Sequence, residues 1–524
     1  MTDKDTLRIA VAQINTVMGD MGGNAARIRD ILAEAARQEA DLVVLPELAL
    51  CGTPPGRLVM HGAFMTACQT ALDVLALETA NGPACLLGAP VRESNAVFNA
   101  AVLLAGGRIA GISRKVSLGP QETGLFAAGP LPGPLALGDL RIGVAVGADL
   151  ATGDVCECLA ETGADLLIGL DCSAYRRAGS DARLSAAVAR VVETGLPLLY
   201  VNAVGGQDEA VFDGASFALL ADRRLAMQLP AFQERIRLTL WRRFETGWQC
   251  TEAPTSDLLS EPQADYAALM LGLRDFVEKN RLSGVVLELA DDTPTALLAT
   301  LAVDALGTDR VQGLSFPTAG GAETCSDVAR FARDLGIRHD VLPLAGAVDA
   351  LERTLGPLFE ITVPDAAEDQ LRARMRGAFV VAAAEKFGAL ALTALTRTDL
   401  LAGTPRCSAD LRAGFAPLRD IGLSAASTLA QLRNRWRPSD AKGPGGEIIP
   451  ARLAEASPEL LDADARLARA EAGAASQPDE TLGWMERRIM GAEGLRRRAA
   501  PGPRLTATAI AGRYPVTNRF PHES

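Results

Sequence analysis

Side chains able to do acid–base, metal or nucleophilic chemistry are sparse in this chain. Its three histidines are His61, His339 and His522, and no two of them have the spacing of a metal-ligand pair. A serine triad would therefore have to use one isolated histidine. The nine cysteines are odd in number and irregularly spaced, which indicates reduced cytosolic thiols rather than a disulfide framework. These residues predict neither a metal site nor a disulfide-stabilised secreted domain.

Length and composition are those of a globular protein. The 524 residues are enough for two to four domains at a typical size of about 150 residues. With 48% hydrophobic, 22% charged and 4% aromatic residues, the chain is neither disordered, collagen-like nor a coiled coil. A net charge of −12 argues against nucleic acid or an anionic membrane as partner, because both need clustered Lys and Arg. No leader and no run of about 18 apolar residues is present, so we expect a cytoplasmic protein without a membrane span.

Two stretches of alternating strands and helices have to position any site. The first has predicted strands at 7–14, 41–45, 84–88, 100–104, 142–146, 166–170 and 198–202, and a helix at 24–38. The second has predicted strands at 284–289, 311–316, 339–344 and 389–393, and helices at 295–306, 324–335 and 368–387. This order predicts an α/β fold in both halves, with a doubly wound parallel sheet in the second. The polar stretch 250–263 is predicted as a linker between domains 1–249 and 264–524, residues 436–480 as loose loops, and 482–498 as a helix.

Motifs spread over nearly the whole chain resemble the bacterial glutamine-dependent NAD synthetases. They include VAQIN at 11–15, LPELAL at 45–50, VGGQDE at 204–209, LAVDALG at 301–307, ARMRG at 373–377, GFAPL at 414–418 and YPVTNRF at 514–520. The resemblance implies a nitrilase-like α-β-β-α sandwich, followed by a parallel-sheet synthetase domain like the adenine nucleotide alpha hydrolases. It also implies two reactions: ammonia is released from glutamine, and it then amidates nicotinic acid adenine dinucleotide with ATP and Mg.

In the first domain, the resemblance maps a glutaminase site that lacks its usual nucleophile. Hydrolysis of an amide by this route needs a thiolate, a general base and a cation near the developing oxyanion. Glu47 and Lys115 match the family's base and cation, but Gly147 stands where the family has its cysteine. Cys172, after the next strand, is a weak substitute candidate, since catalytic geometry tolerates an error of only about 1 Å. The loop after Lys115 is also shorter than in the family.

In the second domain, the resemblance maps a nucleotide site whose residues have changed. The family's glycine-rich phosphate loop reads Ala290, Asp291, Asp292, Thr293, Pro294 and Thr295 here, and the further matched positions are Arg397, Asp399 and Asp410. A carboxylate about 4 Å from a phosphate oxygen repels it by roughly 4 kcal/mol. The same loop is also an ordinary helix start, with Asp292 or Thr293 as N-cap and Pro294 in the first turn.

These departures predict a catalytically degenerate homologue, a pseudoenzyme kept for a structural, self-assembling or regulatory role without a cofactor. Its expected partners are its own copies, as a dimer, octamer or polymer, or an active NAD synthetase paralogue. The alternative hypothesis is a diverged synthetase that uses ammonia, with ATP, Mg and the NAD precursor as ligands. A third is a nucleotide-binding module without turnover.

Overall fold

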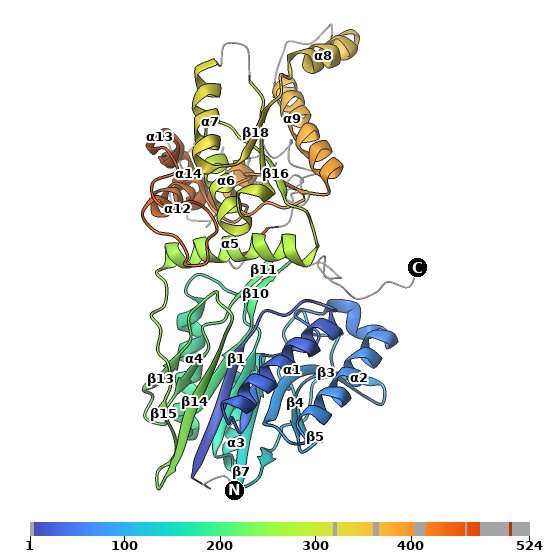
Figure 1. Cartoon of the computed structure of the whole chain (residues 1–524), viewed down its shortest axis with the longest axis vertical. Helices are drawn as coiled ribbons and strands as arrows, with labels where there is room; N and C mark the ends of the chain where they lie inside the picture. Colours follow the sequence, from blue (N-terminus) through green and yellow to red (C-terminus); the bar gives the residue numbers. More distant parts are fainter. Residues whose placement is uncertain are drawn as a thin grey trace. The chain divides into compact units, whose positions relative to one another are not determined.

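The computed structural model of the chain describes residues 5–317, 322–359, 366–402, 414–455, 458–471 and 502–505. These residues form two compact units, one with the residues up to Leu259 and the other spanning Ser260–Leu505 (Figure 1). Within these ranges, no helix is long and apolar enough to cross a membrane.

Two large sheets form the centre of the N-terminal unit. The first has the order β15-β14-β1-β2-β3-β4-β5 and the second the order β13-β12-β9-β8-β7-β6. The strands of the first are β1 (Thr6–Gln13), β2 (Leu42–Val44), β3 (Ala84–Glu93), β4 (Ala96–Ala105), β5 (Arg108–Arg114), β14 (Arg235–Phe244) and β15 (Gly247–Glu252). Those of the second are β6 (Leu135–Leu137), β7 (Leu140–Val146), β8 (Leu166–Asp171), β9 (Leu198–Asn202), β12 (Phe217–Leu219) and β13 (Leu225–Gln228). A separate hairpin joins β10 (Val204–Gln207) and β11 (Ala210–Asp213).

Alternating side chains on these strands build a four-layer sandwich. Ile9 of β1 packs between the sheets with Val144 of β7, whereas the next residue, Ala10, packs with Ile28 of α1. Helices α1 (Met21–Arg37) and α2 (Gly62–Glu78) cover the first sheet, and α3 (Gly153–Glu161) and α4 (Gly179–Thr194) cover the second (Figure 1). The predicted nitrilase-like α-β-β-α sandwich is therefore confirmed.

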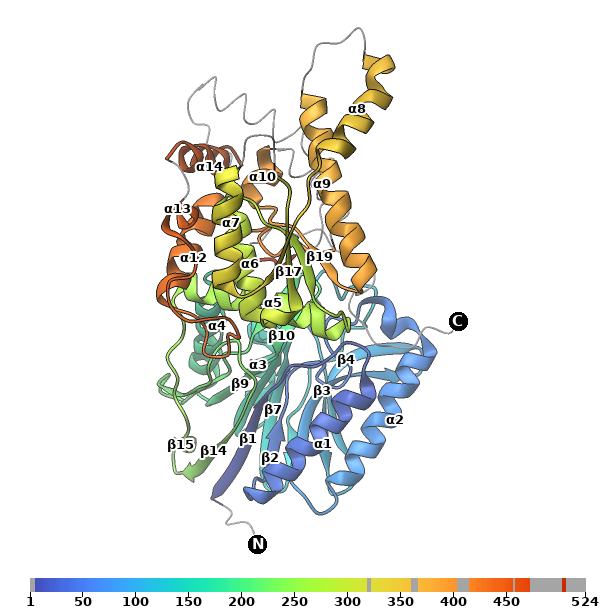
Figure 2. The ribbon, with the colours of Figure 1, turned by 45° about the horizontal axis from the view of Figure 1, so that its top comes forward.

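A four-stranded parallel sheet forms the centre of the C-terminal unit, in the order β18-β17-β16-β19. Its strands are β16 (Val285–Glu288), β17 (Val311–Ser315), β18 (Arg338–Val341) and β19 (Leu390–Leu392). Val286 and Ala391 pack against Val380 and Ala384 of α9 (Ala366–Phe387). Helices α6 (Thr293–Leu306) and α7 (Ala322–Leu335) lie across the strands from α9 (Figure 2). The predicted doubly wound parallel sheet is confirmed.

The remaining helices surround this sheet. They are α5 (Glu261–Lys279), α8 (Ala345–Phe359), α10 (Arg397–Ala402), α12 (Leu423–Arg435), α13 (Ala451–Ala454) and α14 (Pro458–Glu471). Short 3-10 turns are η1 (Gly56–Met60), η2 (Gly147–Leu150) and η3 (Thr308–Arg310). Ser260 and Gln263 form a capping box that fixes the start of α5.

Two predicted irregular stretches contain regular structure. The predicted linker 250–263 is too long, because β15 continues to Glu252 and the capping box starts α5 at Glu261. The stretch 436–480, predicted as loose loops, includes α13 and α14, whose alanines and leucines favour helix. The predicted helix at 482–498 lies outside the described residues.

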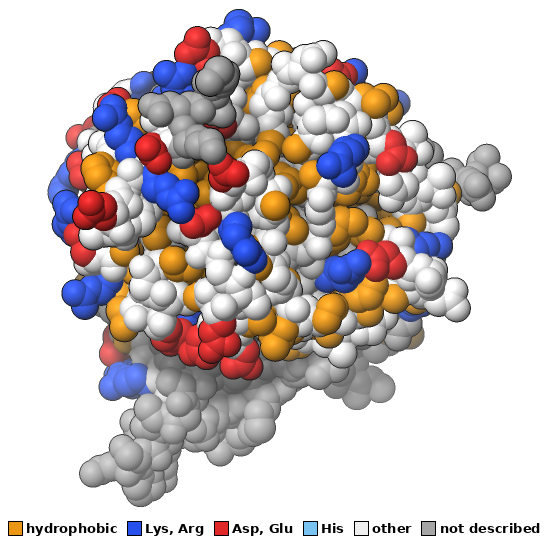
Figure 3. Space-filling model, turned by 90° about the horizontal axis from the view of Figure 1, so that it is seen from below, with side chains coloured by type: hydrophobic (Ala, Val, Ile, Leu, Met, Phe, Trp, Pro, Cys, Tyr) orange, Lys and Arg blue, Asp and Glu red, His pale blue; other side chains and the backbone are white. Residues whose placement is uncertain are grey.

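The surface seen in Figure 3 has Lys and Arg interspersed with Asp and Glu among apolar side chains. Among the coloured residues of this face, no continuous basic field of the kind that binds nucleic acid is present.

Candidate active site

The ends of four strands carry the residues that the sequence assigned to glutamine hydrolysis. Glu47 follows β2 and Lys115 follows β5, both in the first sheet. Gly147 follows β7 and Cys172 follows β8, both in the second sheet. A side-chain hydrogen bond between Cys172 and Glu47 joins the two sheets at this point. The structure therefore brings all four positions into one site.

Glu47 is the central group of this site. Its side chain is only 2% exposed, and its Oε1 accepts hydrogen bonds from Lys115 Nζ at 2.8 Å and from Asn99 Nδ2 at 2.6 Å. The backbone reaches this place because β3 carries Gly88, where a Cβ would lie 2.5 Å from the Glu47 Cα. A buried carboxylate with these two donors is held in one orientation.

Lys115 is a buried ammonium between two carboxylates. Its Nζ lies 2.8 Å from Glu47 Oε1 and 2.8 Å from Glu122 Oε2. Burial acts to lower the pKa of Lys115, but the charges of Glu47 and Glu122 outweigh burial and raise the pKa above its ordinary value. The side chain therefore stays charged at neutral pH and is able to stabilise a developing oxyanion.

The loop after Lys115 contributes Glu122, which the sequence did not predict as part of the site. Glu122 accepts from Asn99 Nδ2 at 3.0 Å and from the Gly119 amide at 2.9 Å, so it closes the shortened loop onto the site. The polar Asn99, in the otherwise apolar β4, was the available signal in the sequence. Its backbone carbonyl also accepts from the Lys115 amide at 2.8 Å.

Gly147 lies against the charged ends of Glu47 and Lys115. Its φ is +51°, and a Cβ built there would lie 2.6 Å from Lys115 Nζ and 2.7 Å from Glu47 Oε2. The turn that begins at Gly147 is held by the buried Asp149, whose carboxylate accepts from the amides of Val116 and Ser117 on the Lys115 loop. Position 147 is thus in the centre of the site but offers no side-chain atom.

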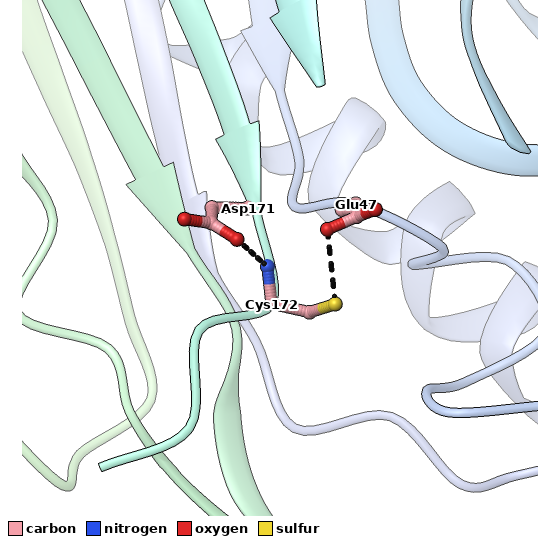
Figure 4. A group of neighbouring side chains, drawn as sticks. All are labelled: Glu47, Asp171 and Cys172. Atoms are coloured by element: carbon pink, nitrogen blue, oxygen red, sulfur yellow. Dashed lines mark hydrogen bonds between the residues drawn. The ribbon is translucent and has the colours of Figure 1, made fainter. Parts of the chain in front are cut away.

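Cys172 supplies the thiol of the site (Figure 4). Its Sγ lies 3.0 Å from Glu47 Oε2, and the Thr53 hydroxyl donates to it at 3.1 Å. Burial, together with the charges of Glu47 and Asp171, raises the pKa of the Cys172 thiol well above its ordinary value. The resting thiol is therefore protonated, and it donates its hydrogen bond to the Glu47 carboxylate.

Glu47, Asp171 and Cys172 are also the one group among the described residues that could bring three metal-ligand atoms together, all within 4.8 Å of one another (Figure 4). Asp171 accepts from the Tyr200 hydroxyl at 2.7 Å and from the Cys172 amide at 2.7 Å. Burial and the Glu47 charge raise the pKa of Asp171 to about 6. Because the Lys115 ammonium already occupies Glu47, this set fits proton transfer better than cation binding.

In the C-terminal unit, the loop between β16 and α6 is a capped helix start. Asp292 is the N-cap, and it accepts from the Thr295 amide and hydroxyl, both at 2.9 Å. Pro294 lies in the first turn, and the Thr295 hydroxyl also donates to the Ala290 carbonyl at 2.9 Å. The N-cap predicted from the sequence is present.

The charge of Asp291 in this loop is not isolated. Asp291 forms an ion pair with Arg452 of α13, and Arg452 also pairs with Asp327 at 2.9 Å. The other matched positions lie near α10, where Arg397 pairs with Asp420 at 3.3 Å. Asp399 accepts from the Thr396 amide and hydroxyl at 3.0 and 2.7 Å. Asp410 lies outside the described residues.

Both domains match known families. Residues 8–240 match the carbon-nitrogen hydrolases and residues 265–480 match NAD synthase. Fold and site therefore define a carbon–nitrogen hydrolase joined to a synthetase. A glutamine-dependent NAD(+) synthetase of Rhodobacter capsulatus is 34% identical over the full length of both chains, and one of Xylella fastidiosa is 32% identical over 98% of this chain and 99% of its own. The chain belongs to the glutamine-dependent NAD(+) synthetase family.

Solved structures agree with this assignment. The glutamine-dependent NAD+ synthetase of Acinetobacter baumannii, in complex with ADP, has a TM-score of 0.81 and 25% identity, with 99% of this chain and all of that chain covered. The enzyme from Cytophaga hutchinsonii has a TM-score of 0.79 at 18% identity, covering 98% of this chain and 97% of its own, and this likeness shows the fold alone.

The pseudoenzyme hypothesis, and with it the expectation that the chain is not an enzyme, is wrong. The relatives that match along the full length are named as enzymes. Because their names also specify glutamine dependence, the alternative of a synthetase that uses only ammonia fits less well. The hypothesis weighed each changed position alone. It missed that Cys172, at the end of β8, donates a hydrogen bond to Glu47. It also missed that Arg452 forms an ion pair with Asp291.

Proposed function

We propose that this chain is a glutamine-dependent NAD+ synthetase. Its N-terminal domain releases ammonia from glutamine, and its C-terminal domain uses that ammonia to amidate the carboxylate of nicotinic acid adenine dinucleotide. The observation that carries the proposal is the buried Glu47, which contacts both an ammonium and a thiol. The full-length identity to relatives of this name supports it.

The contacts of Glu47 and Lys115 match the demands of amide hydrolysis. Glu47 Oε2 is the base that accepts the proton of the nucleophile, and it later returns that proton to the departing nitrogen. Lys115 Nζ, fixed by Glu47 and Glu122, is the cation that meets the negative charge on the amide oxygen. Each group is held before the substrate arrives, so little reorganisation is needed in the transition state.

ATP and Mg²⁺ enter the second reaction as substrates. The ADP found in complex with the Acinetobacter baumannii enzyme supports adenine nucleotide binding by this chain. The described carboxylates Asp291 and Asp399 are engaged, the first by Arg452 and the second by Thr396. They do not fit a ready Mg²⁺ site, and we therefore assign no chemical step to them.

The test is NAD+ formation by the purified full-length chain. With ATP, Mg²⁺ and nicotinic acid adenine dinucleotide, we expect NAD+ from either glutamine or ammonium, with one glutamate released per glutamine-derived NAD+. Glu47→Gln should abolish glutamine hydrolysis, whereas Glu34→Gln, at a half-exposed residue of α1, should not. A folded chain that forms NAD+ from neither nitrogen source would contradict the proposal.

The proposal includes a cytoplasmic location and a homo-oligomeric state. Seven cysteines, Cys51 and Cys172 among them, are free thiols, which supports a reducing compartment. Assembly into a dimer, octamer or polymer, and pairing with a synthetase paralogue, stay predictions that light scattering of the purified protein would check.

A further inference from the structure

We propose that Cys172, at the end of β8, is the nucleophile of the glutaminase reaction, in place of a side chain at position 147. This inference rests on the proposed function and names the sulfur atom that this function requires. It differs from the position of the family's cysteine, which corresponds to Gly147 on the neighbouring strand β7.

Cys172 is in direct contact with a base, Glu47. Cys172 Sγ lies 3.0 Å from Glu47 Oε2, within reach for direct proton transfer, and Thr53 donates to the same sulfur at 3.1 Å. Cys172 as a residue is half-buried. A nucleophile in contact with its base, which is itself oriented by Lys115, is the arrangement of covalent amidases in general.

Other thiols in the chain have different surroundings. Cys51, Cys158 and Cys250 donate to backbone carbonyls, as thiols packed in a core do. Cys85 is fully buried, and burial raises its pKa. Of the cysteines that the structure describes, Cys172 is the one with a recorded hydrogen bond to a carboxylate.

A second observation points to a ligand at this place. The Asn99 side chain is fully buried, and its Nδ2 donates to Glu47 and Glu122. Its Oδ1 has no hydrogen-bond partner among the described residues. Because Nδ2 serves two carboxylates, the orientation of this amide is fixed, and Oδ1 is left as an acceptor. The amide N–H of glutamine is a donor that would satisfy it.

Gly147 makes this arrangement possible. A Cβ at position 147 would lie 2.6 Å from Lys115 Nζ and 2.7 Å from Glu47 Oε2, so the two charged groups could not keep their present positions beside a larger residue. Without that side chain, Glu47 Oε2 is free to receive the hydrogen bond of Cys172. The contact between Cys172 and Glu47 therefore depends on the absence of a side chain at position 147.

The reaction balances with the groups in the site. Glu47 takes the thiol proton as sulfur attacks the amide carbon, and Lys115 stabilises the oxyanion. The C–N bond then breaks, the Glu47 proton goes to nitrogen, and ammonia leaves a thioester on Cys172. Water attacks the thioester, and one of its protons passes to Glu47. The C–S bond breaks, glutamate leaves, and that proton returns to sulfur. The sum is glutamine and water to glutamate and ammonia.

The test is covalent labelling of the full chain with a diazoketone analogue of glutamine. We expect one adduct by intact mass, on the peptide that contains Cys172, and protection by excess glutamine. Cys172→Ala and Cys172→Ser should both lose the adduct and reduce glutamine hydrolysis by at least about a thousand-fold. Cys158→Ala, a half-buried thiol of α3, should retain both. Thermal melts of all three variants check folding, and the serine variant covers the case in which alanine unfolds the chain.

The outcomes separate this inference from the proposed function. An adduct on another cysteine, no adduct at all, or full glutamine hydrolysis by Cys172→Ser overturns the inference. NAD+ synthesis from ammonium by the wild-type chain would then still support the synthetase activity. If the wild-type chain is labelled at Cys172 but forms no NAD+ from any nitrogen source, the result supports Cys172 as the nucleophile. The same result contradicts the proposed function.

Discussion

Cys172 donates a hydrogen bond to the carboxylate of Glu47 across 125 positions of sequence and between two sheets. The two carboxylate oxygens of Glu47 therefore have different partners. Oε2 accepts a hydrogen bond from the thiol, and Oε1 accepts one from the Lys115 ammonium. One carboxylate thus contacts both the proton donor and the cation that amide hydrolysis needs.

Adding one methyl group at position 147 should damage the site more than the fold. In Gly147→Ala, the Cβ displaces Lys115 Nζ and Glu47 Oε2, so we expect glutamine hydrolysis to fall at least about tenfold. Gly138→Ala is the matched control, because Gly138 has a similar φ of +59° with no atom within 4 Å of the added Cβ. Both variants pay a similar backbone strain of about 1 kcal/mol. Equal activity of the two variants would contradict the prediction.

The alkylation rate of Cys172 should rise steadily with pH. Because burial and the charge of Glu47 raise the pKa of this thiol well above its ordinary value, we expect about tenfold per pH unit from pH 7 to 9. Peptide mapping after timed exposure to iodoacetamide measures it. Glu47→Gln removes a negative charge and should move the profile to lower pH. A rate that levels off below about pH 8, as for an exposed thiol of lower pKa, would refute this.

Asp171 should weaken the fold as pH rises. Its pKa is about 6 when folded, against about 4 when unfolded, so between these values the folded state keeps a proton that the unfolded state has released. The free energy of unfolding therefore falls as pH rises through this window, by about 3 kcal/mol from this group. Asp171→Asn removes the effect.

Urea unfolding at about pH 5 and pH 7 measures this difference. Relative to wild type, Asp171→Asn should gain about 1.3 kcal/mol between the two pH values. Asp73→Asn, an exposed residue of α2, should follow the wild-type profile. Parallel profiles for Asp171→Asn and wild type would show that Asp171 does not titrate in this window.

In the C-terminal unit, a buried ion pair should control stability. Arg433 Nε lies 2.5 Å and Nη2 2.9 Å from the Asp304 carboxylate, which also accepts from the Tyr266 hydroxyl at 2.6 Å. Arg433→Met leaves the buried Asp304 carboxylate without its guanidinium partner. The free energy of unfolding, measured with urea, should fall by about 3–5 kcal/mol. Arg435→Met, exposed on the same helix, should cost less than about 0.5 kcal/mol.

A double variant distinguishes the pair from simple packing. Asp304→Leu combined with Arg433→Met removes both charges, so its loss should be smaller than the sum of the two single losses. Additive losses would mean that the two side chains do not interact in the folded state.

The central strands and helices could be predicted from the sequence because they are buried apolar runs of unambiguous length. The β7 and β8 strands and helix α6 follow directly from such runs and from the Asp292 cap. Segments α13 and α14 were missed, because short Ala-rich helices depend on the core they pack against more than on their own pattern.

At the site, Glu47, Lys115 and Gly147 could be located because each follows a strand with a family motif. The sequence could not place three further residues in the site, namely Glu122, Thr53 and Asn99. Their contacts arise only when loops close over strand ends that are distant in sequence. The contact between Cys172 and Glu47 could not be predicted for the same reason. Sequence order places the cysteine 25 residues from Gly147, whereas adjacent parallel strands put both residues beside Glu47.

The most direct test follows the nitrogen atom. The full-length chain is supplied with glutamine carrying heavy nitrogen in its amide, together with ATP, Mg²⁺ and nicotinic acid adenine dinucleotide, and the NAD+ formed is analysed by mass spectrometry. We predict heavy nitrogen in the amide of NAD+ for the wild type and for Cys158→Ala, and none for Cys172→Ser. Unlabelled product or no product from the wild type, or labelled product from Cys172→Ser at the wild-type rate, would contradict the account.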